Sequence, residues 1–440
     1  MSEASGASQI TIKPTSHRGR SAWIALFVLV MIVGFVFSII QPLGGPGDEN
    51  AHVHYVQFLA NTHRLPIWQP NGGGEADYES QHPPLYYAMA AVVYKISGGI
   101  AENWRWHVLR WFSLILGAAL FLVARKFFLE YFRGQFAPAF AATATFMLTP
   151  LTIMHISYIN VDILSVLMCS VILLMCLRMV RRTVTIPDRV ILSLALGFGM
   201  ITKFTVIGTL PMIIFAHFRD SHVDIERARE QRMVRFLYTV LGAVAISGWW
   251  YARNSYLYKT PFIHTTGRFG SGLQLAEITG QGMHLLMLTL RETYLSIWAQ
   301  RGWLHPGPLE ISVYAILTVL LSISAYQGIS SLCSRKGKSI VSDPGNWMAG
   351  LFFASLVIGH QMQVWMVDYE FNAGGRYLLN GFMALLALIF AGLYKTKART
   401  ILLLHFIAVA LIMDAISAHR IWTVLNPQYA PGWHIFQFRP

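Results

Sequence analysis

Charged residues are scarce in this sequence. Only 12% of its 440 residues are Asp, Glu, Lys or Arg, whereas 55% are hydrophobic. Soluble proteins carry about 25% charged residues, which they need to cover their surface. The composition therefore excludes an ordinary soluble enzyme and predicts that lipid forms part of the solvent around the chain.

Cysteine is also rare. Cys169 and Cys176 lie within one apolar run, and Cys333 stands beside a basic cluster. This spacing indicates neither a disulfide framework nor a cysteine metal site. In addition, no glycine-rich loop of the nucleotide-binding type follows a strand pattern.

Positive charge is present in excess, with a formal net charge of +13. The Lys and Arg residues stand in short clusters between apolar runs, which is typical of topology signals in membrane proteins. They do not form the continuous basic face that a nucleic-acid partner needs. We therefore expect membrane lipids as partners and no nucleic acid.

Long apolar runs define the fold class. A run from 190 to 218 is too long for one crossing, so it is interpreted as two short helices that meet at Thr202 and Lys203. We thus predict an all-α polytopic membrane protein, one transmembrane domain over 1–440 with about eleven spans. The runs lie at 23–40, 109–124, 137–156, 163–177, 190–218 (two), 236–252, 311–332, 347–366, 378–394 and 400–417.

The stretch 83–96 decides the topology, because it is apolar but short and begins with two prolines. If it does not cross, the basic clusters at 125–133, 178–182, 219–235, 335–338 and 395–399 share the side of the N-terminal tail, as the positive-inside rule requires. We therefore expect an interfacial helix within a first outer loop, 41–110, and a second long outer loop, 253–310. The protein would lie in the cytoplasmic membrane with its active site facing the periplasm or the outside.

Two acids open the first outer loop directly after the first span. Asp48 could be only a helix N-cap, or it could serve chemistry, because a carboxylate close to the low dielectric of a membrane is costly. Glu49 follows it, and His52 lies four residues after Asp48, on the same helix face. Asp48 and His52 could share a proton or a metal ion.

Three further features place polar groups near the membrane surface. Asn160 and Asp162 stand at the outer end of a span, where Asp162 could also be an N-cap. Lys203 interrupts an apolar stretch, so it must pair, face a wet cavity or snorkel to the interface. Arg376 and Tyr377 follow two glycines at the mouth of a span, where they suit either phosphate recognition or interfacial anchoring.

Taken together, these segments resemble the GT-C clan of membrane glycosyltransferases. Protein O-mannosyltransferases and the lipid A aminoarabinose transferase have a similar first outer loop: an acidic dipeptide, a Pro-Pro-Leu-Tyr helix and an Arg before the second span. A poorly characterised bacterial family of that clan looks closest. The segments are 47–55 (GDENAHVHY), 82–87 (HPPLYY), 110–113 (RWFS), 160–162 (NVD), 248–254 (GWWYARN) and 375–379 (GRYLL).

The resemblance implies a GT-C fold and transfer of a sugar from a polyprenyl-phosphate donor to a glycan or lipid acceptor. It implies Asp48 as the general base, with Asp162, Glu49 and His52 orienting it. Candidates for binding substrate are His52, His82, Asn160, Lys203, Arg253, Arg376 and Tyr377. No cofactor is assigned beyond a divalent metal ion as a candidate, with Asp48, His52 and Asp162 as its candidate ligands.

Two alternatives to an enzyme are a transporter or flippase of lipid-linked sugars and a non-catalytic scaffold for envelope-glycan assembly. Transporters often show two related halves, whereas the acids here concentrate in one early loop. That arrangement favours catalysis at a surface. The sequence does not specify the sugar, the acceptor, the stereochemistry, the metal requirement or the oligomeric state.

Overall fold

The computed structural model describes residues 17–45, 48–69, 74–182, 185–219, 228–263, 275–298, 308–333, 343–366, 374–393 and 399–425. Regular structure in these ranges is helical, apart from two isolated β-bridges at Trp68–Gly74 and Glu75–Asp77. The expected all-α class is confirmed. The longer helices are α1 (His17–Ile40), α4 (Glu102–Tyr131), α7 (Asp162–Arg181), α10 (Ala228–Tyr258), α11 (Leu275–Trp298), α12 (Pro308–Cys333), α14 (Pro344–Met366) and α17 (Arg399–Arg420).

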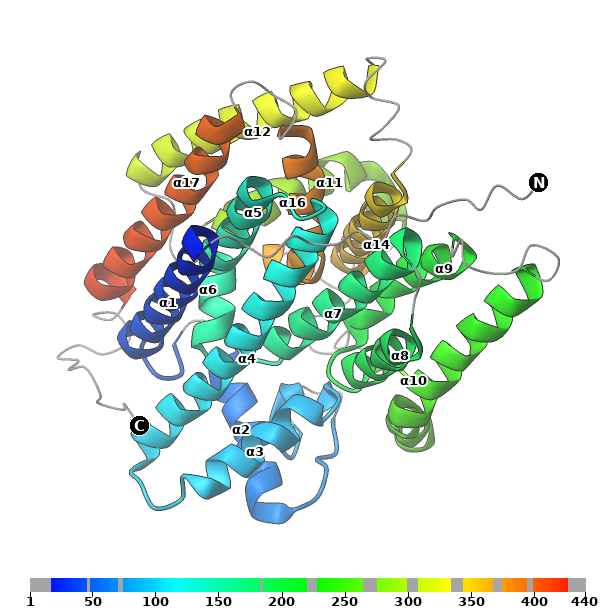
Figure 1. Ribbon diagram of the computed structural model, residues 1–440. Helices are drawn as coiled ribbons and strands as arrows, with labels where there is room; N and C mark the ends of the chain where they lie inside the picture. The colour runs from blue at the N-terminus through cyan, green and yellow to red at the C-terminus, as the bar shows by residue number, and fades with distance from the viewer. Residues whose placement is uncertain are drawn as a thin grey trace.

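The shorter elements connect these helices. They are α2 (Glu49–Thr62), α3 (Leu85–Ile96), α5 (Phe136–Leu148), α6 (Pro150–Ser157), α8 (Ile186–Met200), α9 (Leu210–Arg219), α16 (Leu379–Leu393), the 3₁₀ turns η1 (Tyr78–Gln81), η2 (Phe204–Thr209) and η5 (Gly375–Leu378), and the π turn η6 (Ile421–Leu425). Figure 1 shows α2 and α3 together at one end of the helical body.

Six helices of the described chain are long and apolar enough to cross a membrane, or seven if one bent pair counts as a span. The expected number of eleven is not confirmed. One reason is the run 190–218, where α8 has 15 residues and α9 has 10. At 1.5 Å per residue, neither spans a hydrocarbon core of about 30 Å. The predicted break at Thr202 and Lys203 is confirmed, because α8 ends at Met200 and η2 begins at Phe204.

The run 137–156 is not the single straight span that the sequence analysis expected. It divides into α5 and α6, which meet at an angle of 58°. Pro150 is the first residue of α6, and Thr149 before it has an extended backbone. Proline disfavours a helical conformation in the preceding residue and has no N–H for the helix ladder, so the helix bends at this point.

Helix α7 occupies the centre of the bundle and packs against α4, α8, α9, α14 and α16. In the most apolar stretch of α7, 89% is buried inside the protein, whereas in that of α10 only 22% is buried. Helix α10 contacts α8 and α9 and lies at the edge of the body in Figure 1. The N-terminus of α7 is therefore fixed by surrounding helices on several sides.

The first outer loop folds onto the bundle through α3. This helix has 12 residues, about 18 Å, which is too short to span the membrane. Its first residue, Leu85, donates its backbone N–H to the carbonyl of Ile201 in the break after α8. The Tyr86 hydroxyl accepts the backbone N–H of Asn160, just before α7. The Pro-Pro-Leu-Tyr turn is thereby hydrogen-bonded to two points of the bundle, the break after α8 and the turn just before α7.

Two expectations concern segments further along the chain. The expected outer loop 253–310 contains α11, a helix of 24 residues that the sequence analysis did not predict. Residues 334–342 and 394–398, which hold two of the basic clusters, lie outside the described residues, as do 367–373.

Candidate active site

Asp48 stands immediately before α2, but its side chain does not cap that helix. Instead, the Tyr78 hydroxyl donates to Oδ1 at 2.5 Å, and Arg376 Nη1 donates to Oδ2 at 2.7 Å. Burial raises the pKa of Asp48, but the charge of Arg376 and the hydrogen bonds from Tyr78 and Arg376 lower it by more. The pKa is held well below its usual range, so Asp48 is a carboxylate at neutral pH.

Asp162 is the first residue of α7, and it forms an ion pair with the Lys203 ammonium group. Lys203 reaches it because the chain turns between α8 and η2. Both side chains are nearly buried, with 10% and 11% exposed. Lys203 is therefore a paired cation inside the bundle and not a snorkelling side chain. His155 Nε2 lies 3.8 Å from Asp162 Oδ2 on the other side.

Arg376 and Tyr377 lie on η5, which packs against α11 and α14. The Tyr377 ring lies between two cations: the Arg376 guanidinium is 5.1 Å and the Lys203 ammonium 5.7 Å from its centroid. Arg376 Nη2 also donates to the Tyr377 hydroxyl at 3.1 Å. The ring of His360 stacks on Tyr377 at 5.4 Å. Tyr377 thus joins the Lys203 and Arg376 parts of the site.

Two ion pairs therefore meet at one place, Asp48 with Arg376 and Asp162 with Lys203. Arg376 is within electrostatic range of both carboxylates. In the first pair, 28% of the Asp48 side chain and 32% of the Arg376 side chain are exposed, whereas the second pair is nearly buried. Two acids and two bases give these four residues no net charge. A ligand can reach this cluster from the side of Asp48 and Arg376.

Glu49 has a different environment from Asp48, although the two are neighbours. Its two oxygens accept hydrogen bonds from Arg110 Nε at 2.8 Å and Nη2 at 2.6 Å, and from the backbone N–H groups of Gly44 at 3.0 Å and Ile159 at 3.1 Å. Arg110 is fully buried. Glu49 thus links the end of α1, helix α4 and the turn before α7.

Arg110 also binds the end of the first span. Its Nη1 donates to the carbonyls of Ser38 and Gln41, and its Nη2 donates to that of Pro42, each at 2.9 Å. The last carbonyls of a helix lack partners within the helix and carry partial negative charge, so a guanidinium stabilises them. The acidic dipeptide and the Arg before the second span therefore form one structural unit.

Asn160 is buried and hydrogen-bonded within its own turn. Its Nδ2 donates to the carbonyls of His155 at 2.8 Å and Tyr158 at 2.9 Å, and its Oδ1 accepts the backbone N–H of Ile163 at 3.0 Å. Asn160 therefore performs the helix-capping function that was one interpretation of Asp162. This leaves the Asp162 carboxylate available to Lys203.

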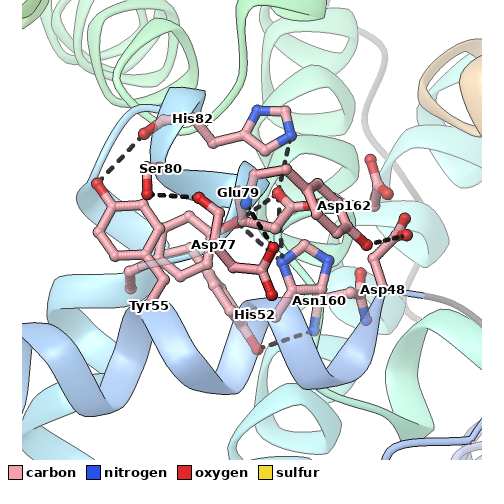
Figure 2. A network of polar contacts seen from close by, with 12 residues as sticks. Asp48, His52, Tyr55, Asp77, Glu79, Ser80, His82, Asn160 and Asp162 are labelled. Atoms are coloured by element: carbon pink, nitrogen blue, oxygen red, sulfur yellow. Dashed lines mark hydrogen bonds and ion pairs between the residues drawn. The ribbon is translucent and has the colours of Figure 1, made fainter. Parts of the chain in front are cut away.

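A second polar cluster lies behind Asp48, centred on the buried Glu79 (Figure 2). Glu79 Oε2 accepts from His82 Nε2 at 3.0 Å and from the Tyr87 hydroxyl at 3.1 Å, and it lies 3.6 Å from His52 Nδ1. His52 Nδ1 is 2.9 Å from the Tyr87 hydroxyl. Burial lowers the pKa of His52, which keeps the imidazole neutral near pH 7. This cluster fixes η1, and η1 carries Tyr78.

Arg253 lies in a different part of the structure. It donates to the carbonyl of Pro66 at 2.8 Å and lies 5.1 Å from the ring centroid of Trp250. The hydrogen bond to Pro66 holds the segment around 66 against α10, and the contact with Trp250 lies within α10. Of the candidate phosphate ligands, Arg376 and Lys203 come together, whereas Arg253 binds the backbone near 66.

The sequence analysis missed three residues of the site, Tyr78, Glu79 and His155. Tyr78 and Glu79 stand among ordinary loop residues, and only the three-dimensional structure places them on Asp48 and on the two histidines. His155 could have been found, because it is an ionisable residue within the apolar run 137–156. The rule that singled out Lys203 applies to it equally.

Asp48, His52 and Asp162 were named as candidate metal ligands. Among the residues that the structure describes, no three His, Cys, Asp or Glu side chains come together as a ligand set. Asp48 is engaged by Tyr78 and Arg376, and Asp162 by Lys203. In this arrangement the three residues do not fit a metal ion, and the divalent ion stays a prediction.

The helical arrangement and this site define a class, the multi-pass membrane proteins with the GT-C fold. ArnT from Cupriavidus metallidurans, bound to undecaprenyl phosphate, is similar in structure with a TM-score of 0.55 and 16% sequence identity, over 94% of this chain and 66% of that chain. The oligosaccharyltransferase AglB from Archaeoglobus fulgidus, in complex with an inhibitory peptide and a dolichol-phosphate, gives 0.51 and 12%, over 97% and 60%.

The chain thus spans slightly less than two thirds of the length of ArnT and 60% of that of AglB. At these sequence identities the likeness is one of fold. No protein-family model and no curated protein matches the sequence. The predicted GT-C fold is confirmed by the structures.

Proposed function

We propose that this protein transfers a sugar from a polyprenyl-phosphate donor to a hydroxyl group of a glycan or lipid acceptor, at the outer surface of the cytoplasmic membrane. The observation that carries the proposal is the meeting of Asp48 with Arg376 at a partly exposed edge of the bundle. The fold supports it, because ArnT, which shares that fold, was solved with undecaprenyl phosphate.

The chemistry needs a proton acceptor and a site for a phosphate leaving group. As the acceptor oxygen bonds to the anomeric carbon, its O–H bond breaks and Asp48 takes the proton. The bond between that carbon and the phosphate oxygen breaks, and its electron pair leaves with the polyprenyl phosphate. Arg376 binds the phosphate, because a planar guanidinium matches its oxygens in a bidentate manner.

The remaining residues support these two. Asp162 and Lys203 form the inner wall of the site, and Tyr377 holds both cations in place. Glu49 and Arg110 fix the backbone on which Asp48 lies. His52 and His82, through Glu79, fix the turn that carries Tyr78. Asn160 shapes the start of α7, and Arg253 holds the loop.

The test is transfer by the purified protein in lipid nanodiscs. A panel of polyprenyl-phosphate sugars and hydroxyl acceptors is supplied, and mass spectrometry detects the glycosylated acceptor and the released polyprenyl phosphate. With a donor that turns over, Asp48→Asn should lower kcat by about 10²- to 10⁴-fold, because it removes the base at constant size.

Glu75→Gln is the matched control. Glu75 lies in the same loop and pairs with Arg64, whose side chain is 53% exposed, so this variant should keep full activity. Turnover retained by Asp48→Asn would remove Asp48 from the catalytic role. Absence of both transfer and lipid-phosphate binding in the wild type would overturn the proposed function.

A further inference from the structure

Both oxygens of Asp48 already hold hydrogen-bond donors. Tyr78 donates to Oδ1 and Arg376 donates to Oδ2. A carboxylate oxygen that accepts one N–H still has a second lone pair, but a paired guanidinium stabilises the charged form of the carboxyl group and so weakens it as a base. In this arrangement Asp48 is therefore a weakened base, and it becomes a stronger one when the guanidinium leaves.

Arg376 is the donor that can leave. It comes from η5, 328 residues away in the sequence, and 32% of its side chain is exposed. A phosphate offers its guanidinium a stronger bidentate partner than the single oxygen that Asp48 provides. The ring of Tyr377 and the charge of Asp162 remain beside Arg376 in either position.

Tyr78 is held more firmly. Its backbone N–H donates to Asp77 Oδ1 at 2.7 Å, and the next residue, Glu79, is buried in the cluster with His52 and His82. Tyr78 can therefore keep Oδ1 in place while Oδ2 changes its partner. It is a positioning residue that the sequence did not indicate.

We propose that the phosphate of the donor and Asp48 compete for Arg376, so that donor binding frees Oδ2 of Asp48 while Tyr78 keeps the carboxylate oriented. This inference rests on the proposed function and adds an order to it: the lipid-linked donor binds before Asp48 reaches its full strength as a base. Until then, Asp48 is a weaker base toward water in the empty site. When the product leaves, Arg376 returns to Asp48 and the proton passes to water.

The competition is measured as affinity for undecaprenyl phosphate, in nanodiscs, by a binding titration. The variants are Asp48→Asn, Arg376→Gln and the double variant, compared with the wild type. Asp48→Asn should bind the lipid at least about five-fold more tightly than the wild type does. This value lies at the lower end of typical coupling between two interactions, because the Asp48–Arg376 pair is partly exposed. In the Arg376→Gln background, Asp48→Asn should increase the affinity for undecaprenyl phosphate by less than about two-fold, because Asp48 there has no guanidinium to compete for.

The double variant separates competition from simple charge repulsion. An equal gain with and without Arg376 would mean that the Asp48 charge only repels the phosphate, and the competition would be wrong. Unchanged or weaker binding by Asp48→Asn would also refute it, although wild-type binding would still support the proposed function. If the wild type itself does not bind undecaprenyl phosphate, both ideas fail together.

Tyr78→Phe tests the positioning residue separately. It should leave affinity for undecaprenyl phosphate unchanged and lower kcat, because it removes only the hydroxyl that holds Oδ1. An unaltered kcat would exclude this role. Circular dichroism and size-exclusion chromatography check that each variant folds, and Arg376→Met, which also removes the charge, replaces Arg376→Gln if the latter does not fold.

Discussion

At the scale of single residues, Asp48 and Glu49 are neighbouring carboxylates with different partners and different roles. Glu49 faces inward, and four N–H donors satisfy it. Asp48 faces the partly exposed edge, where its partners are two side chains from other elements. We therefore assign Glu49 to stability and orientation and Asp48 to chemistry.

Glu49→Gln tests this division. The change leaves the buried Arg110 guanidinium without its counter-charge, and removing one partner of a buried ion pair costs about 3–5 kcal/mol. We expect a clear fall in the thermal unfolding midpoint, measured by scanning fluorimetry in detergent. Asp48→Asn, which affects a partly exposed pair, should shift it much less. Equal shifts for the two variants would contradict the assignment.

The residue types of the site could be predicted from the sequence, but their partners could not. Asp48 and Lys203 were chosen because an ionisable group near the hydrocarbon of a membrane is costly unless it is paired or functional, and Arg376 was chosen because a guanidinium suits phosphate recognition. Which base pairs with which acid depends on helix packing, and Asp48 meets Arg376 across 328 residues. Arg253 has the same residue type as Arg376, yet it binds the backbone near 66.

At the scale of elements, close packing explains the second of the two glycines before Arg376. A Cβ on Gly375 would lie 2.7 Å from Ile297 Cγ1 and 2.9 Å from the carbonyl oxygen of Thr293 on α11. The Gly375 backbone N–H also donates to Ser296 Oγ at 2.6 Å. At Gly374, by contrast, a Cβ would meet nothing within 4 Å. Gly375 thus sets the distance between η5 and α11.

These two glycines give a matched pair of variants. Gly375→Ala should push η5 away from α11 and displace Arg376, because contacts that short require a shift of backbone. We expect at least about ten-fold weaker transfer, since small misplacements of substrate-positioning groups are costly. Gly374→Ala should be close to wild type in the same assay. Similar activity of both variants would show that Arg376 does not depend on this packing.

A helix break could be predicted from the sequence where a charged residue marked it. It could not be predicted where a proline alone caused it. Lys203 drew attention to the interruption between α8 and η2. Pro150 produces a bend of 58° between α5 and α6, although the surrounding sequence is continuously apolar. Helix α11 was missed because Glu277, Gln281 and Arg291 interrupt its apolar pattern.

At the scale of the whole molecule, composition was enough to predict an all-α membrane protein, whereas the number of spans was not. Hydropathy measures how apolar a run is, but it does not show whether the run is straight. The apolar stretches around Pro150 and Lys203 each contain two short helices. Packing against neighbouring helices, and not hydropathy, decides which of them lie deep in the bundle.

The predicted topology can be tested at the two ends of α4, which has 30 residues and is about 45 Å long. In a background with Cys333→Ser, single cysteines at Ala101 and Gln135 are treated with a membrane-impermeant maleimide. Both positions are exposed, and the native Cys169 and Cys176 are buried. Cys at 101 should react in intact cells, and Cys at 135 only after permeabilisation, because the predicted topology places the basic cluster 125–133 on the cytoplasmic side. Reaction of both from the same side would refute the topology.

The long sequence separation between Asp48 and Arg376 also matters during synthesis. A ribosome makes the first outer loop early and η5 near the end, so most of the chain is inserted before the ion pair can form. Arg110, in contrast, meets Glu49 as soon as the second span is complete. The nascent protein can therefore fold its first loop early but gains its complete site only late. A chain cut short before η5 would keep Asp48 and the Glu49–Arg110 pair beside it, and it would lack Arg376, the proposed phosphate ligand.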